Sequence, residues 1–103
     1  MSIHVSRSIE ASARRLFPNL SLEQALAQML LERAQKNLIK YQAMIRQFGD
    51  KYGMDFEKFQ KKTLSSEPSY EEEQDYFDWE LAVTGSVDMQ AEIDKLQKSA
   101  RSK

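Results

Sequence analysis

The sequence predicts an all-α protein, a small helical bundle with two long antiparallel helices, one short connecting helix, and an N-terminal helix or short strand. Residues 21–48 contain neither Pro nor Gly and are rich in Ala, Leu, Gln, Glu, Lys and Arg, which lose little free energy on entering a helix. The chain of 103 residues has only three Gly and two Pro, too few for the many turns of a β-sandwich or barrel. We therefore expect a single helical domain over residues 1–103.

Residues 1–17 are predicted to form an N-terminal arm. Apolar and polar residues alternate from residue 3 to residue 6, which suggests a short strand, although one strand alone is not stable. Ser8 is expected to cap a helix that ends before Pro18, because the residue preceding proline is disfavoured in the α region. The arm is therefore a helix, a short strand, or both.

The segment 21–48 is predicted to be one long helix. Ser21 with Gln24 forms a capping-box pattern at its start, and Gly49 suits the left-handed position after its end. Apolar side chains recur every three or four residues through the segment: Leu22, Leu26, Leu30, Ala34, Leu38, Tyr41, Ile45 and Phe48. A helix of this size is about 42 Å long. One short helix cannot cover it, and we therefore expect a homodimer.

Two further helices are predicted after a tight reversal at residues 50–53. Asp55 is the expected N-cap of a short connecting helix over residues 55–64. Ser69 with Glu72 repeats the capping-box pattern and begins a long C-terminal helix over residues 69–98. Gly85 lies inside this helix, where it either permits close packing or breaks the helix in two, and a continuous helix is the preferred interpretation.

No pattern in the sequence indicates catalysis or metal binding. Without cysteine, the chain has neither a thiolate zinc site nor a cysteine nucleophile, and it contains no glycine-rich phosphate loop. The only histidine, His4, has no cysteine near it in sequence. The carboxylates of residues 71–80 lack the spacing of an EF-hand and are expected to form a solvated helix face. We expect no catalytic residue, no metal and no cofactor.

Charge is unevenly distributed along the chain. Residues 1–62 carry 11 Lys and Arg against 6 Asp and Glu, whereas residues 63–103 carry 4 against 10. This asymmetry indicates either an anionic partner at one end and a basic partner at the other, or two halves that face each other within a chain or across a dimer. Because no signal-peptide pattern and no apolar run of about 18 residues is present, we expect a cytoplasmic protein without membrane contact.

Aromatic residues are concentrated in one acidic window of the C-terminal helix. Core packing is the preferred explanation, and a partner-binding surface is the alternative, since Trp and Tyr are enriched in binding hot spots. Both explanations can hold for different side chains. The candidate partner-binding residues are Tyr70, Tyr76, Phe77, Trp79 and Glu80.

The basic N-terminal segment offers a second candidate surface. Arg7, Arg14 and Arg15 are placed to contact DNA phosphates, and a ribbon-helix-helix protein likewise opens with a strand that reads the major groove. Ser2, His4 and Ser6 would form the polar side of that strand. The sequence pI of about 5.8 is well below that of a strongly basic nucleic-acid binder. DNA binding is therefore the alternative hypothesis rather than the first.

Two sequence blocks resemble a family of small bacterial and archaeal helical proteins that look like the antitoxin half of toxin–antitoxin pairs. The blocks are FGDKYGMDFEKFQKK, Phe48–Lys62, and DYFDWELAV, Asp75–Val83, within a resemblance from Leu30 to Leu96. The resemblance implies a non-enzymatic protein that sequesters a toxin-like partner by helix-in-groove contact. An acidic, aromatic helix suits a partner that is basic because it holds RNA phosphates.

Overall fold

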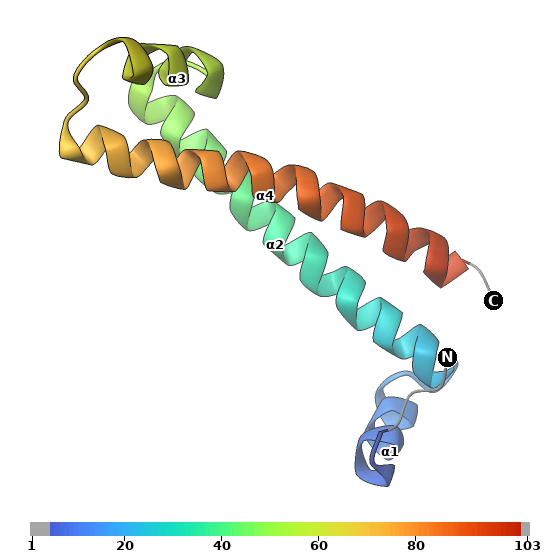
Figure 1. Cartoon of the computed structure of the whole chain (residues 1–103). Helices are drawn as coiled ribbons and strands as arrows, with labels where there is room; N and C mark the ends of the chain where they lie inside the picture. The colour runs from blue at the N-terminus through green and yellow to red at the C-terminus, as the bar shows by residue number, and fades with distance from the viewer. Residues whose placement is uncertain (1–4, 102–103) are drawn as a thin grey trace.

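The computed structural model describes residues 5–101, which form four helices (Figure 1). These are α1 (Arg7–Leu16), α2 (Leu22–Tyr52), α3 (Phe56–Ser65) and α4 (Tyr70–Arg101). No strand occurs in this range, and the all-α class is confirmed.

The beginning of α1 differs from the prediction. Ser6, rather than Ser8, is the N-cap, and its hydroxyl accepts a hydrogen bond from the Ile9 backbone N–H at 3.2 Å. Because Ser6 caps a helix, it is not the polar side of a DNA-reading strand. Ser2 and His4, the other residues assigned to that strand, lie outside the described residues.

The prediction that the long helix ends at Phe48 was wrong, because α2 continues for another turn. Gly49 lies within the helix, and Gly53 takes the left-handed position with φ 65°, its N–H bonded to the Gly49 carbonyl at 2.8 Å. The extra turn carries Lys51 and Tyr52 to hydrogen-bond partners on α4. The capping box that begins the helix is confirmed.

The expected starts of α3 and α4 are confirmed. The Asp55 carboxylate accepts a hydrogen bond from the Lys58 N–H at 2.9 Å. Ser69 and Glu72 exchange two hydrogen bonds, at 2.9 and 3.1 Å, across the start of α4. Beyond this cap, α4 runs through Gly85 without a break and continues past Lys98.

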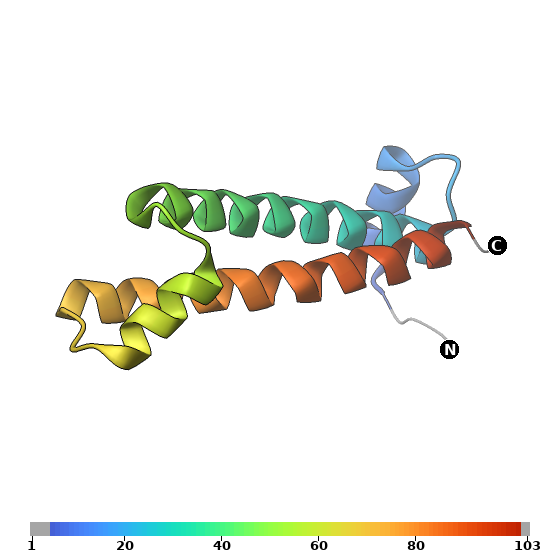
Figure 2. The same cartoon turned by 90° about the horizontal axis from the view of Figure 1, so that it is seen from above.

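The helices α2 and α4 pack along each other and make the main contact of the fold (Figures 1 and 2). Residue numbers fall along α4 as they rise along α2, so the chain runs in opposite directions through the two helices. Four pairs trace the contact: Ala34 with Ile93, Tyr41 with Gly85, Phe48 with Trp79, and Lys51 with Asp75.

The resulting molecule is elongated and has a thin core. Its principal extents are 58 × 25 × 24 Å and its radius of gyration is 19.5 Å, whereas a compact domain of this length has a radius of about 13 Å. Few described residues are buried, namely Ala25, Leu31, Ala34, Phe59, Trp79, Ala82 and Ile93. Within residues 5–101, no helix is both long and apolar enough to cross a membrane.

Candidate partner-binding surface

The end of the molecule where α3 joins α2 and α4 is held by an aromatic core. Trp79 is 1% exposed and Phe59 is fully buried. Four rings lie 5.2–6.2 Å from the Trp79 ring, those of Phe48, Tyr52, Phe56 and Phe59. The assignment of Trp79 to a partner surface is therefore corrected: α3 folds back over α4 and covers its indole.

Tyr76 also serves mainly to hold α3 against α4. Its ring lies 5.6 Å from the ring of Phe56, and its hydroxyl accepts a hydrogen bond from the Gln60 side chain at 2.9 Å. Because the side chain is half-buried, only part of it is available to another molecule.

The outer side of α4 presents the remaining aromatic residues to solvent. Tyr70 is 76% exposed and Phe77 is 60% exposed. Glu73 and Glu80 are exposed as well, and the spacing of three, four and three residues places all four side chains on one helix face. We call this face, with the neighbouring exposed Leu81, the acidic–aromatic stripe: Tyr70, Glu73, Phe77, Glu80 and Leu81.

The stripe is only partly what the sequence predicted. Glu73 and Leu81 were missed, although their spacing from Tyr70 and Phe77 is a signal that the sequence contains. The stripe lies on the side of α4 opposite Ala82 and Ile93, which are buried. Its side chains therefore face away from α2.

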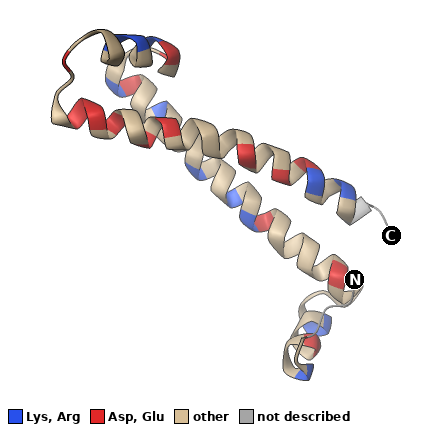
Figure 3. Ribbon diagram, in the orientation of Figure 1, with Lys and Arg blue, Asp and Glu red and all other residues tan. Residues whose placement is uncertain are grey.

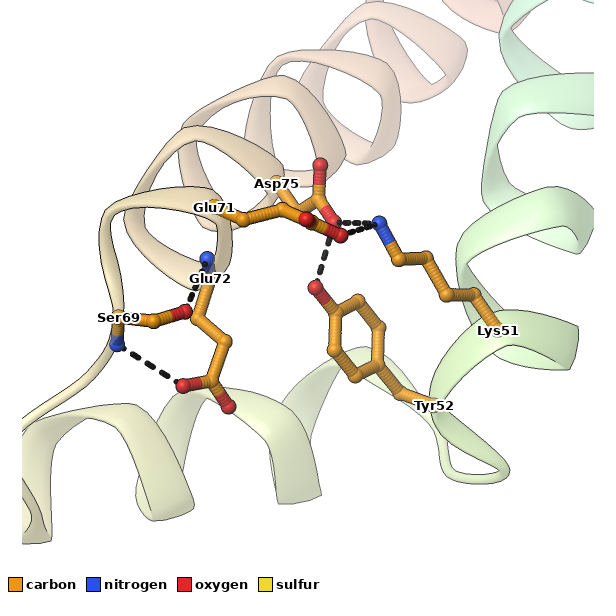
Figure 4. Close-up of polar contacts among 6 residues, drawn as sticks. All are labelled: Lys51, Tyr52, Ser69, Glu71, Glu72 and Asp75. Carbon is orange, nitrogen blue, oxygen red and sulfur yellow. Dashed lines mark hydrogen bonds and ion pairs between the residues drawn. The ribbon is translucent and has the colours of Figure 1, made fainter.

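Several carboxylates at the start of α4 are neutralised from within the chain (Figure 4). The Lys51 ammonium lies 2.5 Å from Glu71 and 2.6 Å from Asp75, and Lys62 lies 3.8 Å from Glu72. Lys and Arg at the end of α2 and on α3 thus face Asp and Glu at the start of α4 (Figure 3). To this extent the basic and acidic halves face each other within one chain.

The carboxylates of the stripe are not neutralised in this way. Among the residues that the structure describes, no ion pair reaches Glu73, Asp78 or Glu80. All three are exposed. Two carboxylates without an ion pair, those of Glu73 and Glu80, therefore flank Phe77 on the stripe.

The pKa values of the inner polar cluster follow from its hydrogen bonds. Burial would raise the pKa of Asp75, but hydrogen bonds from Lys51 and Tyr52 outweigh it, and the net shift is downward. Burial and the hydrogen bond to Asp75 raise the pKa of Tyr52 to about 12. Hydrogen bonds to Asp75 and then Glu71 raise the pKa of Lys51. The Ser69 backbone N–H lowers the pKa of Glu72.

Replacing Asp75 with asparagine is expected to lower the free energy of unfolding at pH 7 by about 1 kcal/mol, because the Tyr52 hydroxyl loses a charged acceptor. Since the folded-state pKa of Asp75 is depressed, its contribution is present above the ordinary Asp pKa of about 4 and is lost as pH falls below it. When urea unfolding is measured from pH 3 to pH 7, the free energy of unfolding should fall less toward low pH in Asp75→Asn than in the wild type.

Asp78→Asn is the matched control, since its carboxylate has no ion pair among the described residues. Identical pH profiles for Asp75→Asn and the wild type would contradict the assigned role of Asp75.

The arginines of the alternative DNA surface are only partly brought together on α1. Arg7 and Arg14 line one shallow depression with Glu10, and Glu10 pairs with Arg14 at 2.9 Å. Arg15 is one residue further on and lies about 100° away around the helix. A carboxylate therefore sits between the two arginines that share a side.

The arrangement of the described side chains suits binding of another molecule. Their Asp and Glu side chains form no group of three that could hold a metal ion. The acidic–aromatic stripe combines exposed rings with uncompensated carboxylates, which suits non-covalent binding of a basic, partly apolar surface. No protein-family model, curated protein or solved structure matches the chain.

Proposed function

We propose that the protein is a non-enzymatic interaction module, an antitoxin that binds and neutralises a basic, toxin-like partner in the cytoplasm. The observation that carries the proposal is the acidic–aromatic stripe on α4. Tyr70 and Phe77 are 76% and 60% exposed, and large exposed aromatic side chains of this kind are enriched in binding hot spots. Most of the surface of both side chains is open to solvent in the described chain, so a partner would gain its burial.

The spacing of the stripe suits binding in a groove. Tyr70, Phe77 and Leu81 are separated by seven and four residues, which is the anchor spacing of a helix that lays one face into an apolar groove. Glu73 and Glu80 flank these anchors and would steer a basic partner toward them. A protein that holds and cuts RNA carries such basic charge around its active site.

The double variant Tyr70→Ala/Phe77→Ala is expected to weaken partner binding by about 100-fold or more, because each hot-spot truncation costs about 2 kcal/mol. The partner would first be recovered by tagged pull-down from the native host and identified by mass spectrometry. Its purified form would then be titrated calorimetrically with each variant. Trp79 stays in place, so the aromatic core is preserved.

Ile39→Ala and Val87→Ala are matched controls, since both remove exposed apolar side chains (each 65% exposed) outside the stripe. Their affinities should equal that of the wild type. A folded Tyr70→Ala/Phe77→Ala variant that binds as tightly as the wild type would show that the stripe is not the binding surface.

The alternative proposal is a DNA-binding regulator that uses Arg7, Arg14 and Arg15. The shared side of Arg7 and Arg14 on α1 favours it, whereas Glu10 between them opposes phosphate binding. It predicts DNA binding that weakens steeply with salt and disappears in the triple alanine variant. A third alternative is a structural helical homo-oligomer without a regulatory partner.

A further inference from the structure

One face of the α2 and α4 pair is left uncovered by the other residues that the structure describes. A groove of about 320 Å³ lies there, lined by Leu30, Arg33, Ala34 and Asn37 of α2 and by Met89, Glu92, Lys95 and Leu96 of α4. Half of these side chains are apolar, and Leu30 is 50% exposed. The groove therefore offers apolar surface that the monomer does not bury.

Further residues along α2 and α4 lie on the same side of their helices as this groove, and we call this surface the open face. Steps of four and three residues keep side chains on one side of a helix. Along α2 the open face comprises Leu26, Leu30, Arg33, Asn37, Lys40 and Met44. Along α4 it comprises Leu81, Asp88, Glu92 and Lys95.

The two short helices lie elsewhere. The α3 contacts on α4 run through Tyr76 and Trp79, which are on other sides of that helix. α1 contacts α2, and its residues Ala13 and Arg14 line a small pocket with Leu22 at the start of α2. The opposite face of α2 carries Gln28, Gln35 and Gln42 and is more polar. The open face is thus a surface of mixed apolar and charged side chains that the other described helices do not cover.

The distribution of charge on the open face indicates which molecule would cover it. The α2 side carries Arg33 and Lys40 and no acidic residue, whereas the α4 side carries Asp88 and Glu92 with Lys95 as its only base. A surface that is basic along one helix and acidic along the next is complementary to a second copy of itself.

We propose that the open face pairs two copies of this chain about a two-fold axis parallel to the long helices, so that α2 of each copy lies on α4 of the other. Within one chain, Tyr41 of α2 lies beside Gly85 of α4. Rotation about this axis moves no residue along the helices, so each α2 residue lies at the same height on α4 of the second copy as on α4 of its own chain. Arg33 then meets Glu92 of the second copy, and Met44 meets Leu81. The result is a four-helix bundle.

The other two-fold arrangement is disfavoured by the same charges. An axis perpendicular to the long helices would place α2 on α2 and α4 on α4. Arg33 and Lys40 would then face basic residues, and Asp88 and Glu92 would face acidic ones. Like charges in contact weaken an interface.

The surface area of the chain fits a dimer of this size. The chain exposes 8093 Å², whereas a compact monomer of 12.0 kDa exposes about 6000 Å². The excess of about 2000 Å² matches what each copy buries in a large obligate dimer. A short peptide in the groove would leave most of this excess exposed.

Charge-reversal variants test whether the open face forms the dimer. Light scattering and sedimentation equilibrium measure the mass of each variant in solution. The wild type is expected at twice the chain mass of 12.0 kDa. Arg33→Glu and Glu92→Arg should each weaken the dimer at least tenfold, and combining them should restore it. Arg46→Glu, a reversal of an exposed residue outside the open face, is the control and should leave the dimer intact.

Cysteine cross-linking tests the symmetry, because the chain has no cysteine of its own. Arg33→Cys and Glu92→Cys chains with different tags would be mixed and oxidised. The proposed axis predicts disulfides between unlike chains, whereas the perpendicular axis predicts disulfides between like chains. A monomeric wild type, a dimer insensitive to both reversals, or like-chain disulfides would each overturn the proposal. Leu81 belongs to both the open face and the acidic–aromatic stripe, but none of these variants replaces a residue of the stripe.

Discussion

Replacing Trp79 with alanine is expected to lower the free energy of unfolding by about 3–5 kcal/mol, the usual cost of deleting a large buried aromatic side chain. Trp79 is 1% exposed, and its ring contacts residues of α2 and α3 from its position on α4. One deletion therefore removes packing from all three helices. Against a typical stability of about 5–15 kcal/mol, the variant would be marginally folded at best.

The measurement is urea unfolding followed by circular dichroism, because Trp79 is the only tryptophan and its fluorescence is lost in the variant. Protein concentration must be equal throughout, since dimerisation would contribute to stability. Phe77→Ala is the control: it is 60% exposed two residues away and should change stability by about 0.5 kcal/mol or less. Equal effects at the two positions would contradict the burial of Trp79.

A more conservative substitution at Trp79 should separate the effect of lost ring packing from the effect of the unpaired indole N–H. The Trp79 indole N–H is buried and has no hydrogen-bond partner among the described residues, and an unsatisfied buried donor costs about 1–3 kcal/mol. Trp79→Phe removes this donor while keeping a ring. Its loss of stability should therefore be clearly smaller than that of Trp79→Ala.

Gly85→Ala is expected to destabilise the protein by about 2 kcal/mol through overpacking. A Cβ atom at Gly85 would lie 2.7 Å from two ring carbons of Tyr41. In a helix that lacked this contact, the same substitution would instead stabilise by about 1 kcal/mol, because alanine is the better helix former. The close approach of α2 and α4 thus decides the sign of the effect.

A double-mutant cycle with Tyr41→Ala checks this interpretation. In the Tyr41→Ala background, Gly85→Ala should become neutral or stabilising, and thermal unfolding at fixed concentration would reveal the reversal. Stabilisation by Gly85→Ala in the wild-type background would show that the Tyr41 ring yields without cost, and that glycine is not needed for the helix contact.

The starts of three helices were predictable from local sequence. Ser21, Asp55 and Ser69 each cap a helix through hydrogen bonds within the next three residues, and such contacts need nothing from the rest of the fold. The all-α class followed for the same reason, since helix propensity and the apolar period of three to four residues are properties of short segments.

The end of α2 was not predictable in this way. Gly49 and Gly53 both suit a left-handed cap, and no local signal chooses between them. The extra turn is stabilised by Lys51 and Tyr52, whose hydrogen bonds reach Asp75, 24 and 23 residues away in sequence. A contact with a distant segment therefore set the boundary.

The candidate surface, too, was predictable from local sequence only in part. The sequence by itself determined that aromatic and acidic residues gather in one helix, and their spacing determines which share a face. Only the tertiary structure decided that Trp79 is covered while Phe77, two residues earlier, stays 60% exposed. The physical reason is that burial depends on where α3 folds back, and helical periodicity carries no information about which face the neighbouring helices occupy.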